Sequence, residues 1–124
     1  MLQALAIASG GALGALLRFY ASSGIYAWLG RGFPYGTLFV NVTGSLIMGL
    51  LFVLFQDRIQ ASPEVRSALL VGVLGAFTTF STFSMETLTL LEEGEMMKAL
   101  INIVLSVTLC ILAAWIGMLG GRQL

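Results

Sequence analysis

The sequence predicts an all-α membrane protein with four transmembrane helices per chain. Of its 124 residues, 58% are hydrophobic and only 10% are charged, and the charged residues leave long uncharged runs between them. A soluble domain carries about a quarter charged residues, so this composition excludes a soluble monomer. A spanning helix uses about 20 residues, and four such helices with short connections use nearly the whole chain.

The uncharged runs place the four spans within a single domain of residues 1–124. These runs cover residues 1–17, 19–30, 32–56, 67–85 and 99–121. We therefore expect transmembrane segments at about 3–29, 36–55, 67–90 and 96–119. Ser62, Pro63 and Glu64 predict a helix start, with proline at the first position and an acid in the first turn.

Composition also excludes several classes of function. Six basic residues balance six acidic ones, so the basic excess of a nucleic-acid-binding protein is absent. The chain has no histidine, and its one cysteine, Cys110, has no partner for an intrachain disulfide or a zinc site. We expect the protein not to be an enzyme.

The basic residues divide evenly between the two sides of the membrane. With four spans, both termini lie on one side, together with Arg58, Arg66 and Arg122. Arg31 and Lys98 lie on the other side, which also holds Arg18 if that side chain points toward the first loop. An excess on one side fixes the orientation of a membrane protein, so this balance permits insertion in both orientations and an antiparallel homodimer.

Polar residues inside the spans are candidates for function. Asn41 lies near the centre of the second span, where it could clamp two helices or face a pathway, and spacing leaves both alternatives open. Asn102, with Ser106 one turn later, poses the same choice. Arg18 either reaches the interface or faces a water-filled cavity that could attract an anion. We expect Glu86 to occupy a solvated position.

The small residues in the spans favour close packing of helices. Gly10 and Gly14 lie four residues apart on one face of the first span. In a membrane, small residues let two helix backbones approach closely, and we expect packing to be the role of most of the 15 glycines. Cys110 is expected to be a small apolar filler on the fourth span.

The third span has an unusual centre. Between Gly72 and Ser84, two glycines are followed by five hydroxyl residues and three phenylalanines. These residues form helices poorly, which predicts a local break whose freed carbonyl groups could bind a cation. The alternative is a continuous helix whose Ser and Thr side chains bond to its own carbonyls. Phe80 and Phe83 share one face if the helix resumes, and their electropositive ring edges could hold a small anion.

Three segments resemble the signatures of a known family. Residues 10–19, 36–45 and 72–84 are similar to the first three spans of the Fluc/CrcB fluoride channels, in the same order. The resemblance implies an antiparallel, dual-topology homodimer in the cell inner membrane. It also implies two fluoride pathways along the dimer interface and passive export that limits fluoride toxicity.

The resemblance also implies roles for individual residues. The rings of Phe80 and Phe83 would meet fluoride with their edges, and Asn41 would donate to it. Further polar partners on the pathway would be Ser81, Thr82, Thr37 and Ser106. Arg18 would lie in the vestibule. Backbone carbonyls of Gly75 and Thr78 from both subunits would hold a structural sodium ion.

Two other functions compete with a fluoride channel. A small four-helix multidrug or cation antiporter depends on an acidic residue deep in the first span, where this chain has only Arg18 as a charged residue. A structural membrane subunit without transport predicts that Asn41 and Ser81 only clamp helices.

Overall fold

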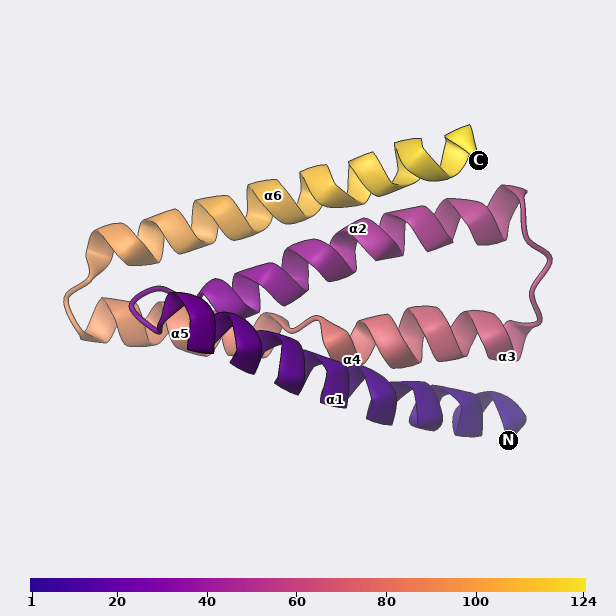
Figure 1. Cartoon of the computed structure of the whole chain (residues 1–124), viewed down its shortest axis with the longest axis horizontal. Coiled ribbons are helices and arrows are strands. Elements are labelled where there is room, and N and C mark those ends of the chain that lie inside the picture. The colour runs from indigo at the N-terminus through magenta and orange to yellow at the C-terminus, as the bar shows by residue number, and fades with distance from the viewer.

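Four long helical segments form a bundle in the computed structural model, which describes residues 1–124, and consecutive segments run in opposite directions (Figure 1). The first, second and fourth segments are α1 (Leu2–Leu29), α2 (Tyr35–Asp57) and α6 (Met96–Gln123). The third, Pro63–Glu92, comprises α3 (Pro63–Arg66), η1 (Ser67–Leu74), α4 (Gly75–Phe77) and α5 (Phe80–Glu92). All four are long and apolar enough to cross a membrane, which confirms the predicted number of spans.

The third segment begins at Pro63, earlier than the predicted start near residue 67. The Ser62 side chain accepts a hydrogen bond of 3.3 Å from the Val65 amide, and Pro63 occupies the first helical turn. The predicted helix start at Ser62 and Pro63 is therefore confirmed. The helix begins before the uncharged run at residue 67 because its first turn is stabilised by the Ser62 cap and by a proline, and not by apolar side chains.

The backbone changes form twice along this third segment. Residues Ser67–Leu74 form a π-helix, η1, and Thr78 and Thr79 are both extended. The ribbon uncoils visibly between α4 and α5 (Figure 1). No proline accounts for the change, since Pro34 and Pro63 are the only prolines in the chain.

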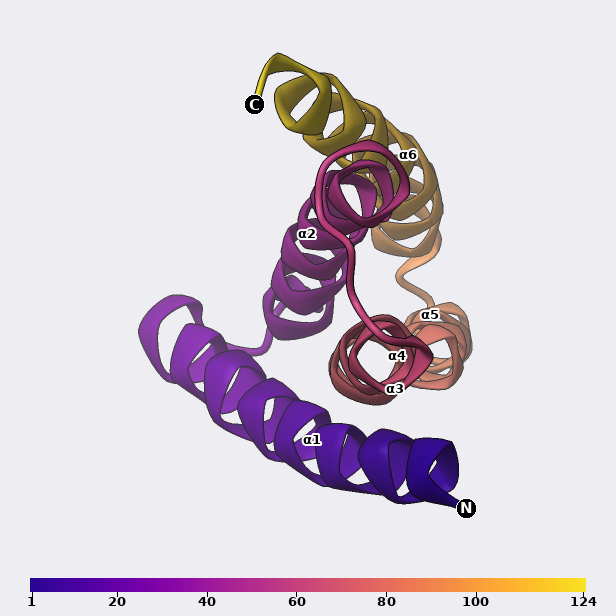
Figure 2. The same cartoon turned by 90° about the vertical axis from the view of Figure 1, so that its right-hand side faces the viewer.

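Glycines lie in the two most extensive helix contacts, which are those of α2 with α6 and of α1 with η1. A Cβ atom at Gly49 would overlap the backbone of Ala114, and one at Gly14 would overlap the backbone of Val73. In Figure 2, α6 lies beside α2, while α1 lies beside the third segment. The prediction that Gly10 and Gly14 serve helix packing is confirmed, because Gly10 meets the Ala68 backbone in the same way.

The outer surface of the bundle is apolar. Trp28 is 78% exposed, and Ile111 and Trp115 are exposed as well. In water such a surface would drive association, whereas in a bilayer lipid chains or a second protein copy cover it. The arrangement therefore agrees with the composition, which left too few charged residues to cover a soluble fold.

Candidate functional site

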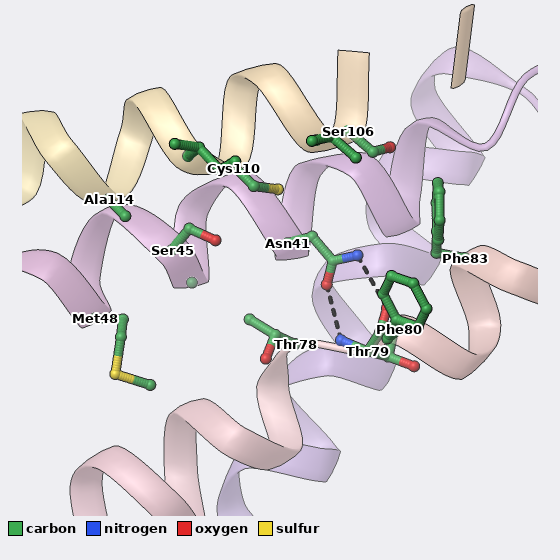
Figure 3. A pocket seen from close by; sticks show the side chains of 13 residues that line it. Asn41, Ser45, Met48, Thr78, Thr79, Phe80, Phe83, Ser106, Cys110 and Ala114 are labelled. Atoms are coloured by element: carbon green, nitrogen blue, oxygen red, sulfur yellow. Dashed lines mark hydrogen bonds between the residues drawn. The ribbon is translucent and has the colours of Figure 1, made fainter. Parts of the chain in front are cut away.

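Asn41 and Thr79 bind each other at the break in the third segment. The Asn41 Nδ2 atom donates to the Thr79 carbonyl at 3.0 Å, and the Thr79 amide donates to Asn41 Oδ1 at 2.8 Å (Figure 3). In a continuous α-helix, the Thr79 amide would instead donate to the carbonyl of Gly75. A side chain from α2 thus replaces the helical acceptor that the Thr79 amide has lost, and the Gly75 carbonyl is left without that donor.

Thr79 also begins the next helix. Its hydroxyl accepts a bond of 3.2 Å from the Thr82 amide, which is the N-cap arrangement of α5. The hydroxyl groups of Ser81 and Thr82 lie 3.3 and 3.1 Å from the Thr79 hydroxyl. Sequence reasoning did not single out Thr79. The sequence did contain a pattern that could have identified it. Thr79 stands three residues before Thr82, which is the N-cap spacing, at the start of a segment that favours helix again.

The larger cavity at this site has a volume of about 420 Å³ and lies between α2, α6 and the break. Its polar lining combines hydroxyl, amide and thiol groups, and its apolar lining includes two phenylalanine rings (Figure 3). The residues that matter here are Asn41, Ser45, Thr78, Thr79, Phe80, Phe83, Ser106 and Cys110. Cys110 was expected to fill space between helices, and it lies half-buried at this cavity.

The two phenylalanine rings at the cavity are neighbours. The ring centroids of Phe80 and Phe83 lie 5.3 Å apart, with an angle of 47° between the ring planes. Phe83 is buried, whereas Phe80, the first residue of α5, is 76% exposed. Their shared face, predicted from the spacing, is confirmed. One ring therefore belongs to the interior of this chain and the other faces outward.

A second cavity of about 230 Å³ lies against the other face of the break. Arg18 and Ser22 of α1, Thr37 of α2, and Thr79 and Thr82 line it. The half-buried Arg18 side chain makes no hydrogen bond or ion pair within the chain, so its charge is available to this cavity. Thr79 lines both cavities, which places the break between a basic pocket and an aromatic one.

The predicted site residues do not all meet. Asn41, Thr78, Phe80, Phe83 and Ser106 line the first cavity, and Arg18, Thr37 and Thr82 line the second. The exposed Ser81 lines neither. Thr37 is buried on the α1 side of α2, where its hydroxyl lies 3.3 Å from the Tyr26 hydroxyl, and it lines a different cavity from Asn41.

A second amide clamps α5 to α6. Asn102 is 1% exposed, and its Nδ2 atom donates to the Thr87 hydroxyl at 2.9 Å. That hydroxyl donates in turn to the Phe83 carbonyl at 2.7 Å. Ser106 donates to Asn102 Oδ1 at 3.2 Å. Of the two alternatives left open for Asn102, the interhelical clamp is the one that these bonds support.

The expectation that Glu86 occupies a solvated position is wrong. Its Oε2 atom accepts a hydrogen bond from the Tyr26 hydroxyl, and its Oε1 atom is buried without a hydrogen-bond partner in this chain. The hydrogen bond from Tyr26 to Glu86 forms because α1 and α5 both approach the first turn of α2. The sequence of the third span alone does not reveal this approach.

The chemistry of this site is that of donors and oxygen atoms. No group of three or more His, Cys, Asp or Glu side chains could hold a metal, whereas carbonyl and hydroxyl oxygens gather at the break. Amide and hydroxyl donors, ring edges and an arginine are the groups that stabilise an anion.

Known proteins resemble this chain along nearly its full length. Residues 5–118 match the family described as CrcB-like protein, Camphor Resistance (CrcB). The chain is 57% identical over 123 residues to the fluoride-specific ion channel FluC of Methylococcus capsulatus, covering 99% of this chain but only 54% of that protein. It is 55% identical to the protein of the same name from Magnetococcus marinus, covering 94% of each chain. The chain therefore belongs to the CrcB-like family.

Proposed function

We propose that the protein is a fluoride-selective passive channel that exports fluoride and so limits its toxicity. Its relatives from three organisms carry the name fluoride-specific ion channel, at 52 to 57% identity. The observation that carries the proposal is the first cavity, where Asn41, Thr79 and Ser106 lie with the rings of Phe80 and Phe83. A channel of this kind catalyses no reaction, so the protein is not an enzyme.

Fluoride is small and strongly hydrated, so a selective pathway must replace its water with fixed donors. The amide of Asn41, the hydroxyl groups around Thr79 and the edges of the two rings supply such groups in a site shaped by the protein. Larger halides would fit these groups poorly. The Arg18 charge in the second cavity would attract the anion toward the break.

The working channel is an antiparallel, dual-topology homodimer in the inner membrane, with two pathways along the interface between subunits. One chain leaves Phe80 mostly exposed at the edge of the first cavity, so a single subunit does not enclose the site. The even division of basic residues supports insertion in both orientations. Both termini lie at the same end of the bundle, as the assignment of the basic residues to two sides of the membrane assumed (Figure 1).

A structural sodium ion fits the carbonyl groups at the break. The Thr79 amide, which a continuous helix would direct to the Gly75 carbonyl, is bound to Asn41 instead. Thr78 is extended, and Gly75 is exposed, with only the Leu70 carbonyl oxygen, at 3.8 Å, near the position that a Cβ atom would take. Carbonyl oxygens of Gly75 and Thr78 from two copies would hold the ion, which would supply a positive charge where the subunits meet.

The decisive test of function is anion efflux from liposomes that contain the purified protein. We expect rapid loss of fluoride and little loss of chloride, without ATP or a proton gradient. Protein-free liposomes and liposomes with a heat-inactivated sample are the controls. A well-folded protein that releases neither ion, or both equally, would contradict the proposal.

The sodium site predicts a cation effect on assembly. Exchange of sodium for N-methylglucamine should lower the temperature at which the detergent-solubilised dimer unfolds, because a bound ion stabilises the state that binds it. Potassium at the same ionic strength is the control for general salt effects. Equal unfolding temperatures in all three salts would argue against a resident sodium ion.

A further inference from the structure

Tyr26 joins three helices at a point outside both cavities. Its hydroxyl donates to Glu86 Oε2 of α5. The Tyr26 hydroxyl oxygen also lies 3.3 Å from the Thr37 hydroxyl and 3.4 Å from the Thr37 amide nitrogen of α2. No other side-chain hydrogen bond joins α1 to α5. The phenol is therefore bonded on both sides, as a donor to a carboxylate and as an acceptor at the start of α2.

Gly36 provides the space for this ring. A Cβ atom at Gly36 would overlap the Tyr26 ring and would lie 2.8 Å from the Ser22 carbonyl. The ring thus packs directly on the backbone of the first turn of α2. This contact fixes where the hydroxyl lies, because the phenol is rigid beyond its two rotatable bonds.

Positive groups lie around the Tyr26 phenol that bonds to Glu86. The N-cap of α2 is Pro34, whose side chain makes no capping bond, so the Thr37 amide uses the Tyr26 oxygen instead. The positive end of the α2 dipole therefore lies behind the phenol. The Arg31 guanidinium lies over the Tyr26 ring, 4.5 Å from its centroid, and adds a positive charge on the same side.

The hydrogen bond from Tyr26 also orients the second carboxyl oxygen of Glu86. Glu86 Oε1 is the only buried side-chain polar atom of the chain that has no hydrogen-bond partner. Such an atom is costly unless the assembled protein supplies a donor. With Oε2 fixed by Tyr26, the carboxyl group cannot turn freely, and Oε1 is held in one direction one helical turn beyond Phe83.

We propose that Tyr26 is a positioning residue that holds the Glu86 carboxyl group in a single orientation next to the ion pathway. The inference rests on the proposed function, since the pathway is that of the fluoride channel. Tyr26 touches neither cavity and acts only through Glu86 and the start of α2.

The first experiment measures the hydrogen bond without transport. The infrared carboxyl band of Glu86 is identified in purified protein as the band that Glu86→Gln removes. We expect Tyr26→Phe to shift this band, because the Oε2 atom loses its donor. Tyr20→Phe, which changes a 68% exposed tyrosine of the same helix, is the matched control and should leave the band in place. An unshifted band in Tyr26→Phe overturns the proposal, whether or not the protein conducts fluoride.

The second experiment measures coupling in fluoride efflux. Loss of a hydrogen bond to a charged group predicts that Tyr26→Phe lowers the rate about tenfold, with Tyr20→Phe near the wild-type rate. In the Glu86→Gln background, the same change should lower the rate less than twofold, because its target is gone. Equal effects in both backgrounds overturn the positioning role. Failure of the wild-type protein to release fluoride would instead contradict the proposed function.

Folding provides a further check if Tyr26→Phe cannot be purified. Its defect should then come from a carboxyl group with no partner on either oxygen, and Tyr26→Phe with Glu86→Gln should restore a folded protein. A double variant that also fails to fold, while Glu86→Gln alone folds, would show that Tyr26 acts independently of Glu86.

Discussion

At the scale of single residues, the Asn41 side chain makes hydrogen bonds of the kind that backbone groups make inside a helix. Its amide gives Thr79 one N–H donor and one oxygen acceptor, the same pair of groups that a peptide unit offers, and its second N–H is not used by Thr79. The sequence left a clamp and a pathway donor as open alternatives for Asn41. These two hydrogen bonds make the clamp. The Asn41 side chain also lines the first cavity, and its role as a donor to fluoride there stays a prediction.

Asn41→Asp should destabilise the fold while keeping the shape of the side chain. A carboxylate still accepts from the Thr79 amide but faces the Thr79 carbonyl with an oxygen, so the free energy of unfolding should fall by about 1–3 kcal/mol. The measurement is thermal unfolding in detergent. Gln56→Glu makes the same chemical change at an exposed position of α2 and should alter stability by less than about 0.5 kcal/mol. Equal stability of the two variants would contradict the clamp.

Phe80→Ile should slow fluoride efflux with little effect on folding. The ring is mostly exposed in the single chain, so its loss removes little packing. Edge contacts between two aromatic rings contribute about 0.5–1.5 kcal/mol, and we expect the edge of Phe80 to contribute on the same scale. We expect a rate roughly threefold to tenfold lower than that of the wild type. Phe52→Ile, at another exposed phenylalanine, is the control. A normal rate in folded Phe80→Ile would remove the ring-edge role.

At the scale of helices, close backbone contact holds the bundle together. Apolar side chains gain nothing by leaving lipid for protein, so helix association depends on fit, and glycine gives the closest fit. Gly117 of α6 lies against the backbone of Leu46 and Leu50 of α2, and Gly49 lies against α6 in return. The two glycines lock the pair of helices that form one wall of the first cavity.

Gly117→Ala should therefore separate α2 from α6. Its Cβ atom would overlap the Leu46 carbonyl and lie 2.8 Å from the Leu50 amide, so the expected loss of stability is about 1–3 kcal/mol or more. Gly120→Ala is the matched control, because no atom lies within 4 Å of its Cβ and alanine favours helix by up to about 1 kcal/mol. Thermal unfolding of both variants gives the comparison. A stable Gly117→Ala protein would show that the contact is looser than described.

At the scale of the whole molecule, the balance of basic residues predicts insertion into the membrane in both orientations. Arg58 donates to the Arg122 carbonyl and Arg66 donates to the Phe55 carbonyl, so these three basic residues lie together near the C-terminus. Lys98 donates to the Gly32 carbonyl, next to Arg31 in the first connection. Both termini lie at one end of the bundle (Figure 1). A few added charges can decide the orientation of a small membrane protein when the starting bias is weak.

Added lysines should therefore abolish function when all copies are forced one way. Gln60→Lys with Gln123→Lys favours one orientation, and Glu92→Lys with Glu93→Lys favours the opposite one, all at exposed positions. Each double variant alone should give little fluoride efflux, and co-expression of the two should restore it. C-terminal reporter fusions measure the orientation. Full efflux from either double variant alone, with a single measured orientation, would contradict an antiparallel dimer.

Much of the fold could be predicted from the sequence, but less of the site. The four spans followed from uncharged runs, and the helix start at Ser62 and Pro63 followed from local chemistry. Thr79, by contrast, gained its importance from a partner 38 residues away in sequence, and the roles of Tyr26 and Glu86 depend on a contact across 60 residues. Spacing along one helix carries no information about such partners.

The sequence by itself determined that this protein crosses a membrane four times and that the third span is polar and weakly helical at its centre. Composition and periodicity suffice for that, because the bilayer imposes length and hydropathy on each span separately. Only the tertiary structure decided that Asn41 closes the break, that Thr37 and Glu86 meet at Tyr26, and that Arg18 and the Phe80–Phe83 pair face two different cavities. These facts depend on how the helices are rotated and how closely they approach, which the packing of glycines on neighbouring backbones sets.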